Sequence, residues 1–201
     1  GVDRTVFSPL AQDEQEYAAG VLKGLGVTGP FILFVGTIEP RKNLSNLLEA
    51  FAALKSGRKF AGPLVIVGMK GWMMGPLTDT LNRKGLSGEV MFLGYVTDEQ
   101  LRVLYHKTEV FVFPSLYEGF GFPIIEAFAC GAAVVASNTS SCAEVVGDAA
   151  LTAAPDRPQD IAAAIVRMIE DPSLKASLKA KGLKRADQFS FDTTARRTLE
   201  V

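Results

Sequence analysis

Short apolar runs recur along the chain and alternate with segments of helical periodicity. Runs that are apolar throughout, rather than at every second residue, are typical of parallel strands covered on both faces. Parallel strands need crossover connections, which are right-handed and usually helical. The sequence therefore predicts an α/β fold, with a doubly wound parallel sheet of about six strands in a three-layer α/β/α sandwich. The expected strands are 31–35, 64–67, 90–93, 110–113, 133–136 and a short sixth at 149–153.

The segments between these runs predict the helices. After Asn43, the expected N-cap residue, the apolar side chains from Leu44 to Leu54 fall on one helical stripe. Thr97 and Gln100 have the spacing of a capping box, which predicts the start of another helix. Further helices are expected over 12–23, within 76–84 and in the C-terminal region 158–201, where Asp171-Pro172 separates two of them.

The length and composition favour a single domain. At 201 residues, 48% of them hydrophobic, the chain can bury a core of its own. Its 21 basic and 22 acidic residues give a formal net charge of −1 and form no long blocks, which argues against a general nucleic-acid surface or a polybasic membrane patch. We therefore expect no nucleic acid among the partners, and an anionic ligand needs a local site.

Two further features indicate a cytoplasmic protein. No apolar run approaches the roughly 18–20 residues that span a bilayer, and the N-terminus lacks the charged-then-apolar order of a signal peptide. Cys130 and Cys142 have no framework spacing and no C-x-x-C motif, so they are expected to be reduced, small hydrophobic residues. Peripheral membrane contact through a partner or a missing segment stays open.

Ligands of doubly wound sheets bind beyond the carboxyl ends of the strands. Arg41 and Lys42 follow the first expected strand directly before a helix, so two cations and unpaired helix N–H groups stand together. This arrangement suits a diphosphate, although a solvated basic turn explains these residues alone equally well. The expected carboxyl-end segments are 36–43, 68–72, 94–96, 114–122 and 137–141.

The longest chemical motif follows the fourth expected strand, where two carboxylates flank a loop that contains glycine. Gly119 and Gly121 permit a tight turn and a close approach of a ligand to the backbone. Glu126 falls in the first turns of the next helix, whose dipole favours a carboxylate by roughly 0.3–1 kcal/mol, so a purely structural role for it stays open. Glu118 lies among aromatic residues, where a charge is usually either solvated or bound. Both carboxylates can therefore reach one ligand from different sides.

Other motifs are weaker. His106, the only histidine, is expected at the surface, and together with two distant cysteines it makes no metal site, so we expect no metal. Ser141 and Glu144 fit a capping box better than a catalytic serine, since no histidine follows them. The glycines within 68–75 are spaced G-x-x-G-x-x-x-G and do not match a dinucleotide fingerprint.

The segment from Glu118 to Glu126 resembles the E-x7-E signature of retaining GT-B glycosyltransferases of the group 1, glycogen-synthase-like family. The resemblance continues through 127–149 and upstream through 35–43, so it covers nearly the whole chain. It implies that residues 1–201 form the nucleotide-sugar-binding domain, which is a Rossmann-like half of a GT-B enzyme. Within it, 1–10 is similar to the family's interdomain linker, and 158–201 supplies the C-terminal helices.

The resemblance also implies roles for individual residues. Lys42 would bind the donor diphosphate, with Arg41 as its companion. Glu126 would accept hydrogen bonds from the ribose hydroxyls, while Glu118 approaches the transferred sugar. Many relatives carry Gly-Arg where this chain has Gly36-Thr37, so one phosphate contact is either missing or replaced by Arg41. The expected catalytic residues are Glu118 and Glu126, and the expected donor-binding residues are Gly36, Thr37, Arg41, Lys42, Lys70, Tyr95, Val96, Gly119, Phe120, Gly121 and Phe122.

For activity, the resemblance implies retaining transfer of a hexose from an NDP-sugar to a hydroxyl acceptor, without a metal or other cofactor. Residues 39–43 resemble bacterial polysaccharide mannosyltransferases, which makes GDP-mannose the first donor to test. The acceptor site, and any membrane contact, is expected on a missing N-terminal domain, so this fragment alone is expected to transfer little. Two alternatives stay open: a stand-alone nucleotide-sugar-binding module, and a non-retaining GT-B relative such as an epimerase.

Overall fold

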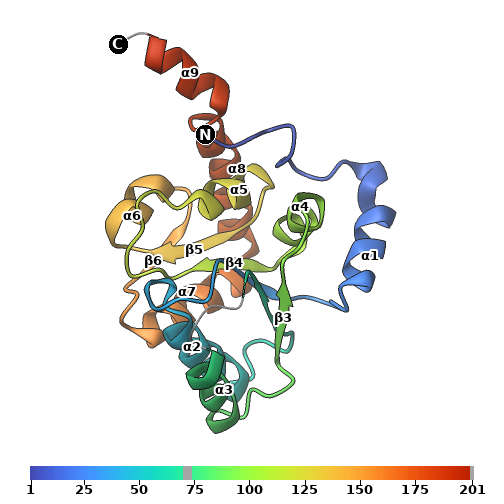
Figure 1. Cartoon of the computed structure of the whole chain (residues 1–201), viewed down its shortest axis with the longest axis vertical. Helices are drawn as coiled ribbons and strands as arrows, with labels where there is room; N and C mark the ends of the chain where they lie inside the picture. The colour runs from blue at the N-terminus through green and yellow to red at the C-terminus, as the bar shows by residue number, and fades with distance from the viewer. Residues whose placement is uncertain (70–73, 200–201) are drawn as a thin grey trace.

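Six parallel strands form one sheet at the centre of the part of the molecule that the structure describes (Figure 1). The computed structural model describes residues 1–69 and 74–199. The strands are β1 (Ile32–Val35), β2 (Leu64–Val67), β3 (Val90–Gly94), β4 (Val110–Phe113), β5 (Val134–Ser137) and β6 (Leu151–Ala153). Their order in the sheet is β3-β2-β1-β4-β5-β6, and all neighbouring pairs are parallel. The predicted Rossmann-like, doubly wound sheet is therefore confirmed.

The chain changes direction at β1. From β1 it proceeds outward to β2 and β3, and then returns across the sheet to β4 on the other side of β1. Leu33 of β1 accordingly lies opposite Val65 of β2 and opposite Phe111 of β4. In folds of this type, ligands bind in the crevice at the carboxyl ends of the two strands where the order reverses, which here are β1 and β4.

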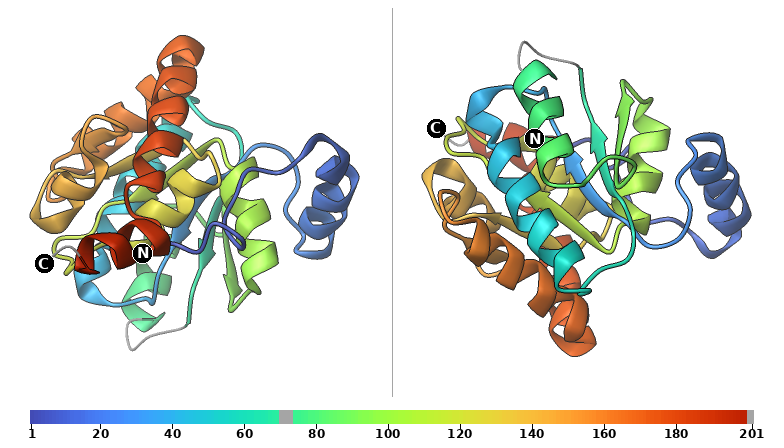
Figure 2. Two further views of the ribbon diagram at one scale, coloured as in Figure 1. Left: turned by 90° about the horizontal axis from the view of Figure 1, so that it is seen from above. Right: turned by 90° about the horizontal axis from the view of Figure 1, so that it is seen from below.

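Helices cover both faces of the sheet and complete the predicted three layers. The helices are η1 (Gln12–Glu14), α1 (Gln15–Gly24), η2 (Pro40–Lys42), α2 (Leu44–Ser56), α3 (Met74–Arg83), α4 (Asp98–Lys107), α5 (Phe122–Ala129), α6 (Ser140–Val146), α7 (Pro158–Glu170), α8 (Pro172–Asp187) and α9 (Phe191–Leu199). α2, α3 and α7 lie below the sheet in Figure 1, and α4, α5 and α6 lie above it. α1 packs on α4, and α8 packs on α5 (Figure 2). No helix in the described ranges combines the length and the apolarity that a bilayer crossing needs.

The central strands are buried on both sides, which explains their continuous apolar sequences. Leu33, Phe111 and Phe113 point into the core beneath α4 and α5. Ile32 and Val112 point into the opposite core beneath α2 and α7. Burying a side chain of this size contributes roughly 1.5–3 kcal/mol, so the two cores together hold the strands in one register.

The C-terminal region contains α9 in addition to the two predicted helices. α7 and α8 are separated at Asp171-Pro172 as expected, and α9 then projects from the body of the molecule beside the N-terminus (Figure 1). There the N–H of Val2 donates to the carbonyl of Phe189 at 2.8 Å. Phe191 and Leu199 of α9 are exposed.

Two predicted helix starts differ in their local chemistry. The Thr97 hydroxyl accepts from the N–H of Gln100, and the Gln100 side chain accepts from the N–H of Thr97, so this capping box is confirmed. Asn43 lies at the N-cap position of α2, but it has a left-handed backbone with φ 61° and makes no side-chain cap. Its amide instead donates to the carbonyls of Pro114 and Pro155, at 2.9 and 2.6 Å, and so joins three loops.

Glycines at the ends of β1 and β2 let the two strands approach closely at the binding rim. The N–H of Gly36 donates to Val67, and the N–H of Gly68 donates to Gly94, both at 2.9 Å. Gly36 and Gly68 have φ values of 154° and 142°, which other residues rarely adopt. A Cβ on Gly68 would lie 2.1 Å from the carbonyl oxygen of Gly36. This rim therefore has no room for a side chain at residue 68.

We expect Gly68→Ala to destabilise the fold by about 2–4 kcal/mol, because the new methyl group meets backbone that cannot move without disturbing the sheet. Urea unfolding measures the effect. Gly20→Ala is the matched control: its Cβ meets nothing within 4 Å in the exposed middle of α1, and there Ala should stabilise by about 0.5–1 kcal/mol. Equal stabilities of the two variants would contradict the close contact of Gly68 with Gly36.

Candidate functional site

The loops that follow β1 and β4 meet at the carboxyl edge of the sheet. The N–H of Leu116 donates to the carbonyl of Arg41 at 2.8 Å, which ties the two loops together through their backbones. Asn43 adds its hydrogen bond to Pro114 beside this contact. The Arg41-Lys42 turn is the short helix η2, so both cations are presented at the switch point of the sheet.

Glu118 is held by both of these cations. Arg41 Nη1 lies 2.6 Å from Glu118 Oε2, and Lys42 Nζ lies 2.6 Å from Glu118 Oε1. The side chains of Lys42 and Glu118 are only 9% and 8% exposed, whereas that of Arg41 is 46% exposed. Lys42 Nζ also lies 4.8 Å from the centre of the Phe113 ring, a cation–π contact. The sequence prediction that these residues share one rim is met for Arg41, Lys42 and Glu118.

The environment of Glu118 favours its charged form. Burial raises the pKa of this carboxyl, but the hydrogen bonds from Lys42 and Arg41 outweigh burial and hold the pKa below its ordinary value. The buried Ser115 hydroxyl lies close enough to lower the pKa of Glu118 further. Its geometry is too poor for a regular hydrogen bond, and it has no other partner among the described residues.

Arg41 has a second carboxylate partner that sequence reasoning missed. Glu39 Oε1 lies 2.6 Å from Arg41 Nη2, and the Glu39 side chain is 32% exposed. Since Glu39 immediately precedes η2, its proximity to Arg41 is a local consequence of the turn. The turn therefore brings two cations and two carboxylates together.

Glu126 lies on α5 in a different setting. Its Oε2 accepts a hydrogen bond of 3.0 Å from the hydroxyl of Tyr105, which belongs to α4 and is fully buried. Burial raises the pKa of Glu126, and the charge of Asp98 raises it further. Within the described residues, no hydrogen bond or ion pair joins Glu126 to Arg41 or Lys42. The structure thus gives the two carboxylates of the motif separate partners.

The loop between these carboxylates presents unpaired backbone donors. The N–H groups of Gly119, Phe120 and Gly121 make no hydrogen bond to the described part of the chain. Gly121 is the N-cap of α5 with φ 94°, and a Cβ on Gly119 would meet nothing within 4 Å. These donors stand at a helix N-terminus, where an anion or a sugar hydroxyl is well accommodated.

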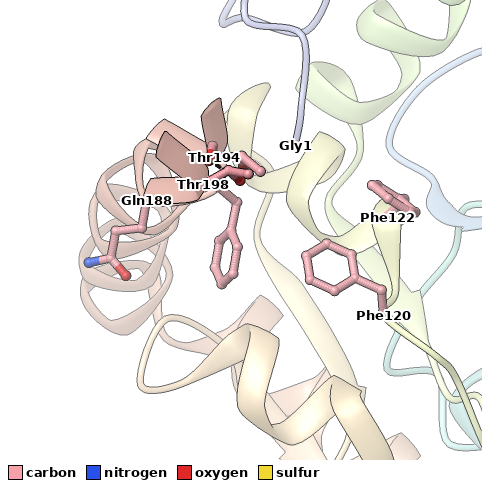
Figure 3. Close-up of a pocket in the computed structure, with 7 residues that line it drawn as sticks. Gly1, Phe120, Phe122, Gln188, Thr194 and Thr198 are labelled. Atoms are coloured by element: carbon pink, nitrogen blue, oxygen red, sulfur yellow. Dashed lines mark hydrogen bonds between the residues drawn. The ribbon is translucent and has the colours of Figure 1, made fainter. Parts of the chain in front are cut away.

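The side chains of Phe120 and Phe122 face a cavity of about 690 Å³ (Figure 3). Their rings lie 4.9 Å apart, and Phe120 is 5.7 Å from the ring of Phe189. Arg41, Lys42, Glu118 and Glu126 do not line this cavity. Phe120 and Phe122 can therefore contact a ligand bound at these polar residues only through their backbone groups. The lining residues are Gly1, Phe120, Phe122, Gln188, Phe189, Thr194 and Thr198.

The remaining expected donor-binding residues are dispersed. Gly36 packs against Lys42, whose Cε would lie 3.4 Å from an added Cβ, and Thr37 is exposed. Tyr95 and Val96 follow β3, which β2 separates from β1, so they stand apart from the cations. Tyr95 is exposed, whereas the Val96 side chain belongs to the core. Lys70 lies outside the described residues.

Hydroxyl side chains before and within α6 hold the backbone of the Glu118 loop. Thr139 donates to the carbonyl of Leu116 at 3.2 Å, Ser140 accepts from the N–H of Glu118 at 3.2 Å, and Ser141 donates to the carbonyl of Glu118 at 2.9 Å. The capping-box interpretation of Ser141 is wrong, because α6 begins at Ser140 with Thr139 at its N-cap position, and the Ser141 hydroxyl donates to the Glu118 loop instead. The only sequence signal for this role is the run of hydroxyl residues at a predicted strand end.

The surface position predicted for His106 is also wrong. The ring is half-buried, and its Nδ1 lies 3.3 Å from the donating N–H of Leu10. Burial lowers its pKa. Cys130 and Cys142 are buried, and burial raises the pKa of Cys130 to about 12. Among the described residues, no three side chains of His, Cys, Asp or Glu gather where they could hold a metal ion.

Comparisons with known proteins agree with the fold. The chain superposes on Anabaena Alr3699/HepE, solved in complex with UDP and glucose, with a TM-score of 0.85 and 24% identity, over 100% of this chain and 54% of that one. It also superposes on the C-terminal domain of the glycosyl transferase group 1 family protein LpcC from Francisella tularensis, with a TM-score of 0.78 and 24% identity, over 94% of this chain and 97% of that one. At this identity, the two likenesses bear on the fold alone.

Sequence comparison identifies the family. The chain is 42% identical over 171 residues to O-antigen chain mannosyltransferase B of Escherichia coli, a match that covers 85% of this chain and 45% of that protein. The chain thus spans between about a fifth and about half of the length of the curated relatives it matches. The family model described as Glycosyl transferases group 1 matches residues 23–185. This chain therefore belongs to the group 1 glycosyl transferase family.

Proposed function

We propose that this chain is the donor-binding domain of a retaining GT-B glycosyltransferase. The observation that carries the proposal is the pair of cations, Arg41 and Lys42, gathered around Glu118 where the strand order reverses. Two adjacent cations beside unpaired helix N–H groups match the charge and the donor requirements of a diphosphate. They neutralise that charge without a metal, so the proposal includes no metal or other cofactor.

The nucleoside end of the donor is assigned to Glu126. The hydroxyl of Tyr105 donates to Oε2 of this carboxylate, and Oε1 has no hydrogen-bond partner within the described part of the chain, so it can accept from a ligand. A carboxylate fixed by one hydrogen bond is well suited to the vicinal hydroxyls of a ribose, because charge-assisted hydrogen bonds are the stronger ones. Anabaena HepE, which shares this fold, was solved with UDP and glucose, in keeping with a nucleotide sugar as the ligand.

The hexose is assigned to the space beside the Glu118 loop. In the proposed reaction, the bond between the anomeric carbon and the diphosphate breaks, and a bond to the acceptor oxygen forms on the same face of the sugar. The leaving diphosphate takes the acceptor proton. The N–H groups of Gly119, Phe120 and Gly121, which have no partner among the described residues, would hold sugar hydroxyls during this step. Neither carboxylate has to act as a nucleophile.

The donor and the acceptor are proposed from the relatives. The Escherichia coli relative is an O-antigen mannosyltransferase, so GDP-mannose is the first donor to test. Because this chain spans 45% of that relative, we assign the acceptor to an N-terminal domain outside this sequence. A cytoplasmic location, and contact of that domain with a membrane, belong to the same proposal.

We expect Lys42→Ala to lower the affinity for GDP by about 10–100-fold, because a charged hydrogen bond contributes roughly 1.5–3 kcal/mol. The affinity for GMP should fall much less, since only the β-phosphate loses its contact. Isothermal titration calorimetry of the 201-residue chain measures both. Lys59→Ala, which removes an exposed lysine paired with Glu170, is the control. Equal losses of affinity for GDP and GMP would contradict the proposed contact between Lys42 and the β-phosphate.

Glu126→Gln should reduce the preference of the chain for GDP over 2′-deoxy-GDP. A ribose-binding carboxylate makes the 2′-hydroxyl worth about tenfold in affinity, whereas the amide of the variant accepts from it more weakly. The comparison needs four titrations, with each nucleotide against each protein. If the variant keeps the full preference for the ribonucleotide, Glu126 does not bind the ribose.

The isolated chain is expected to bind a nucleotide sugar and to transfer little from it, because the proposed acceptor site lies on another domain. Incubation with GDP-mannose or UDP-glucose, and measurement of released GDP or UDP, tests this. Rapid turnover by this chain alone would contradict the assignment of the acceptor site to another domain. It would instead indicate that this chain is a complete enzyme.

A further inference from the structure

We propose that Glu118 competes with the donor diphosphate for Arg41 and Lys42. In the free chain the carboxylate of Glu118 forms ion pairs with both cations. Binding of a nucleotide sugar would exchange this carboxylate for the diphosphate and release it toward the hexose. This inference rests on the proposed function, and it adds a mechanism by which the same site distinguishes a nucleotide sugar from a free nucleoside diphosphate.

The charges around the turn are balanced before any ligand arrives. Lys42 is paired with Glu118, and Arg41 is paired with both Glu118 and Glu39. Two cations and two carboxylates leave the turn formally neutral. A diphosphate approaching this neutral turn gains little attraction until one of the carboxylates gives up its place. Glu118 Oε2 accepts from Arg41 and Glu118 Oε1 accepts from Lys42, so this one carboxylate blocks both phosphate contacts.

Burial keeps the charges paired throughout the exchange. The Lys42 and Glu118 side chains are almost wholly inaccessible, so neither charge can be left unpaired while the other moves away. Arg41 is the accessible member of the group, with 46% of its side chain exposed. An arriving phosphate can therefore reach Arg41 first and replace Glu118 there, before it takes the place of the carboxylate at Lys42.

Only the side chain of Glu118 has to move. Its N–H is held by Ser140 and its carbonyl by Ser141, and Thr139 holds the carbonyl of Leu116 close by. The space beside the next residue is open, because a Cβ on Gly119 would meet nothing within 4 Å. The backbone is thus fixed, and the proposed exchange needs only rotation of the Glu118 side chain from the cations toward a ligand.

The exchange favours the intact donor. After release, the carboxylate of Glu118 needs new hydrogen-bond donors, and the hydroxyls of a hexose supply them. A nucleoside diphosphate lacks these hydroxyls, so only solvent can donate to the released carboxylate. Glu118 should therefore weaken the binding of the free diphosphate more than that of the nucleotide sugar, which also promotes release of the diphosphate after transfer.

The decisive variant is Glu118→Gln, which removes the competing charge and keeps the side-chain shape. Calorimetric titration with GDP and UDP, and separately with GDP-mannose and UDP-glucose, compares it with the unsubstituted chain. For whichever nucleotide binds, we expect the affinity for the diphosphate to rise by about tenfold, and the ratio of nucleotide-sugar to diphosphate affinity to fall by a similar factor. Glu170→Gln, at an exposed glutamate paired with Lys59, controls for net charge and should change neither quantity.

Glu39→Gln is the second variant, in case Glu118→Gln fails to fold with Lys42 left buried. It removes the exposed carboxylate from Arg41 alone, so the diphosphate affinity should rise by about two- to threefold. A diphosphate affinity that is unchanged or lower in a folded Glu118→Gln chain overturns the competition. So does an unchanged affinity in Glu39→Gln if only that variant folds. If the unsubstituted chain binds none of the four ligands, the proposed function fails and the inference fails with it.

Discussion

The ion pair between Lys42 and Glu118 is the contact on which the arrangement of the rim depends. The two residues are 76 positions apart, and their side chains join the loop after β1 to the loop after β4 over 2.6 Å. A buried pair adds little net stability compared with apolar packing, but loss of either partner costs about 3–5 kcal/mol because it leaves a charge without compensation. The pair therefore specifies one relative position of the two loops.

The two carboxylates of the E-x7-E segment occupy opposite electrostatic environments. Two cations hold the pKa of Glu118 below its ordinary value, so the stability contributed by Glu118 is present above the ordinary carboxyl pKa and is lost as the pH falls through the lowered value. Burial raises the pKa of Glu126, so its contribution has the opposite sign and is lost as the pH rises through the raised value. Groups whose environments separate their pKa values in this way are typical of functional sites.

The loop from Gly119 to Phe122 has two distinct sides. Its N–H groups from Gly119 to Gly121 make no hydrogen bond within the described residues, whereas the rings of Phe120 and Phe122 line an apolar cavity with Phe189. The hydroxyls of Thr139, Ser140 and Ser141 fix the backbone just before this loop. This short segment can therefore offer backbone donors to a ligand while its two rings pack against Phe189.

The sequence by itself determined the fold class and the segments that form the binding rim, because uniform apolar runs specify strands buried on two faces and polar residues must follow them at the strand ends. It also placed Arg41, Lys42 and Glu118 at that rim. Only the tertiary structure decided which of these groups are partners: that Glu118 pairs with both cations, that Tyr105 holds Glu126, and that Ser141 grips the Glu118 loop instead of capping its helix. Partners this distant in sequence leave no periodic signal, since their contacts arise only when the crossovers bring the carboxyl ends of separate strands together.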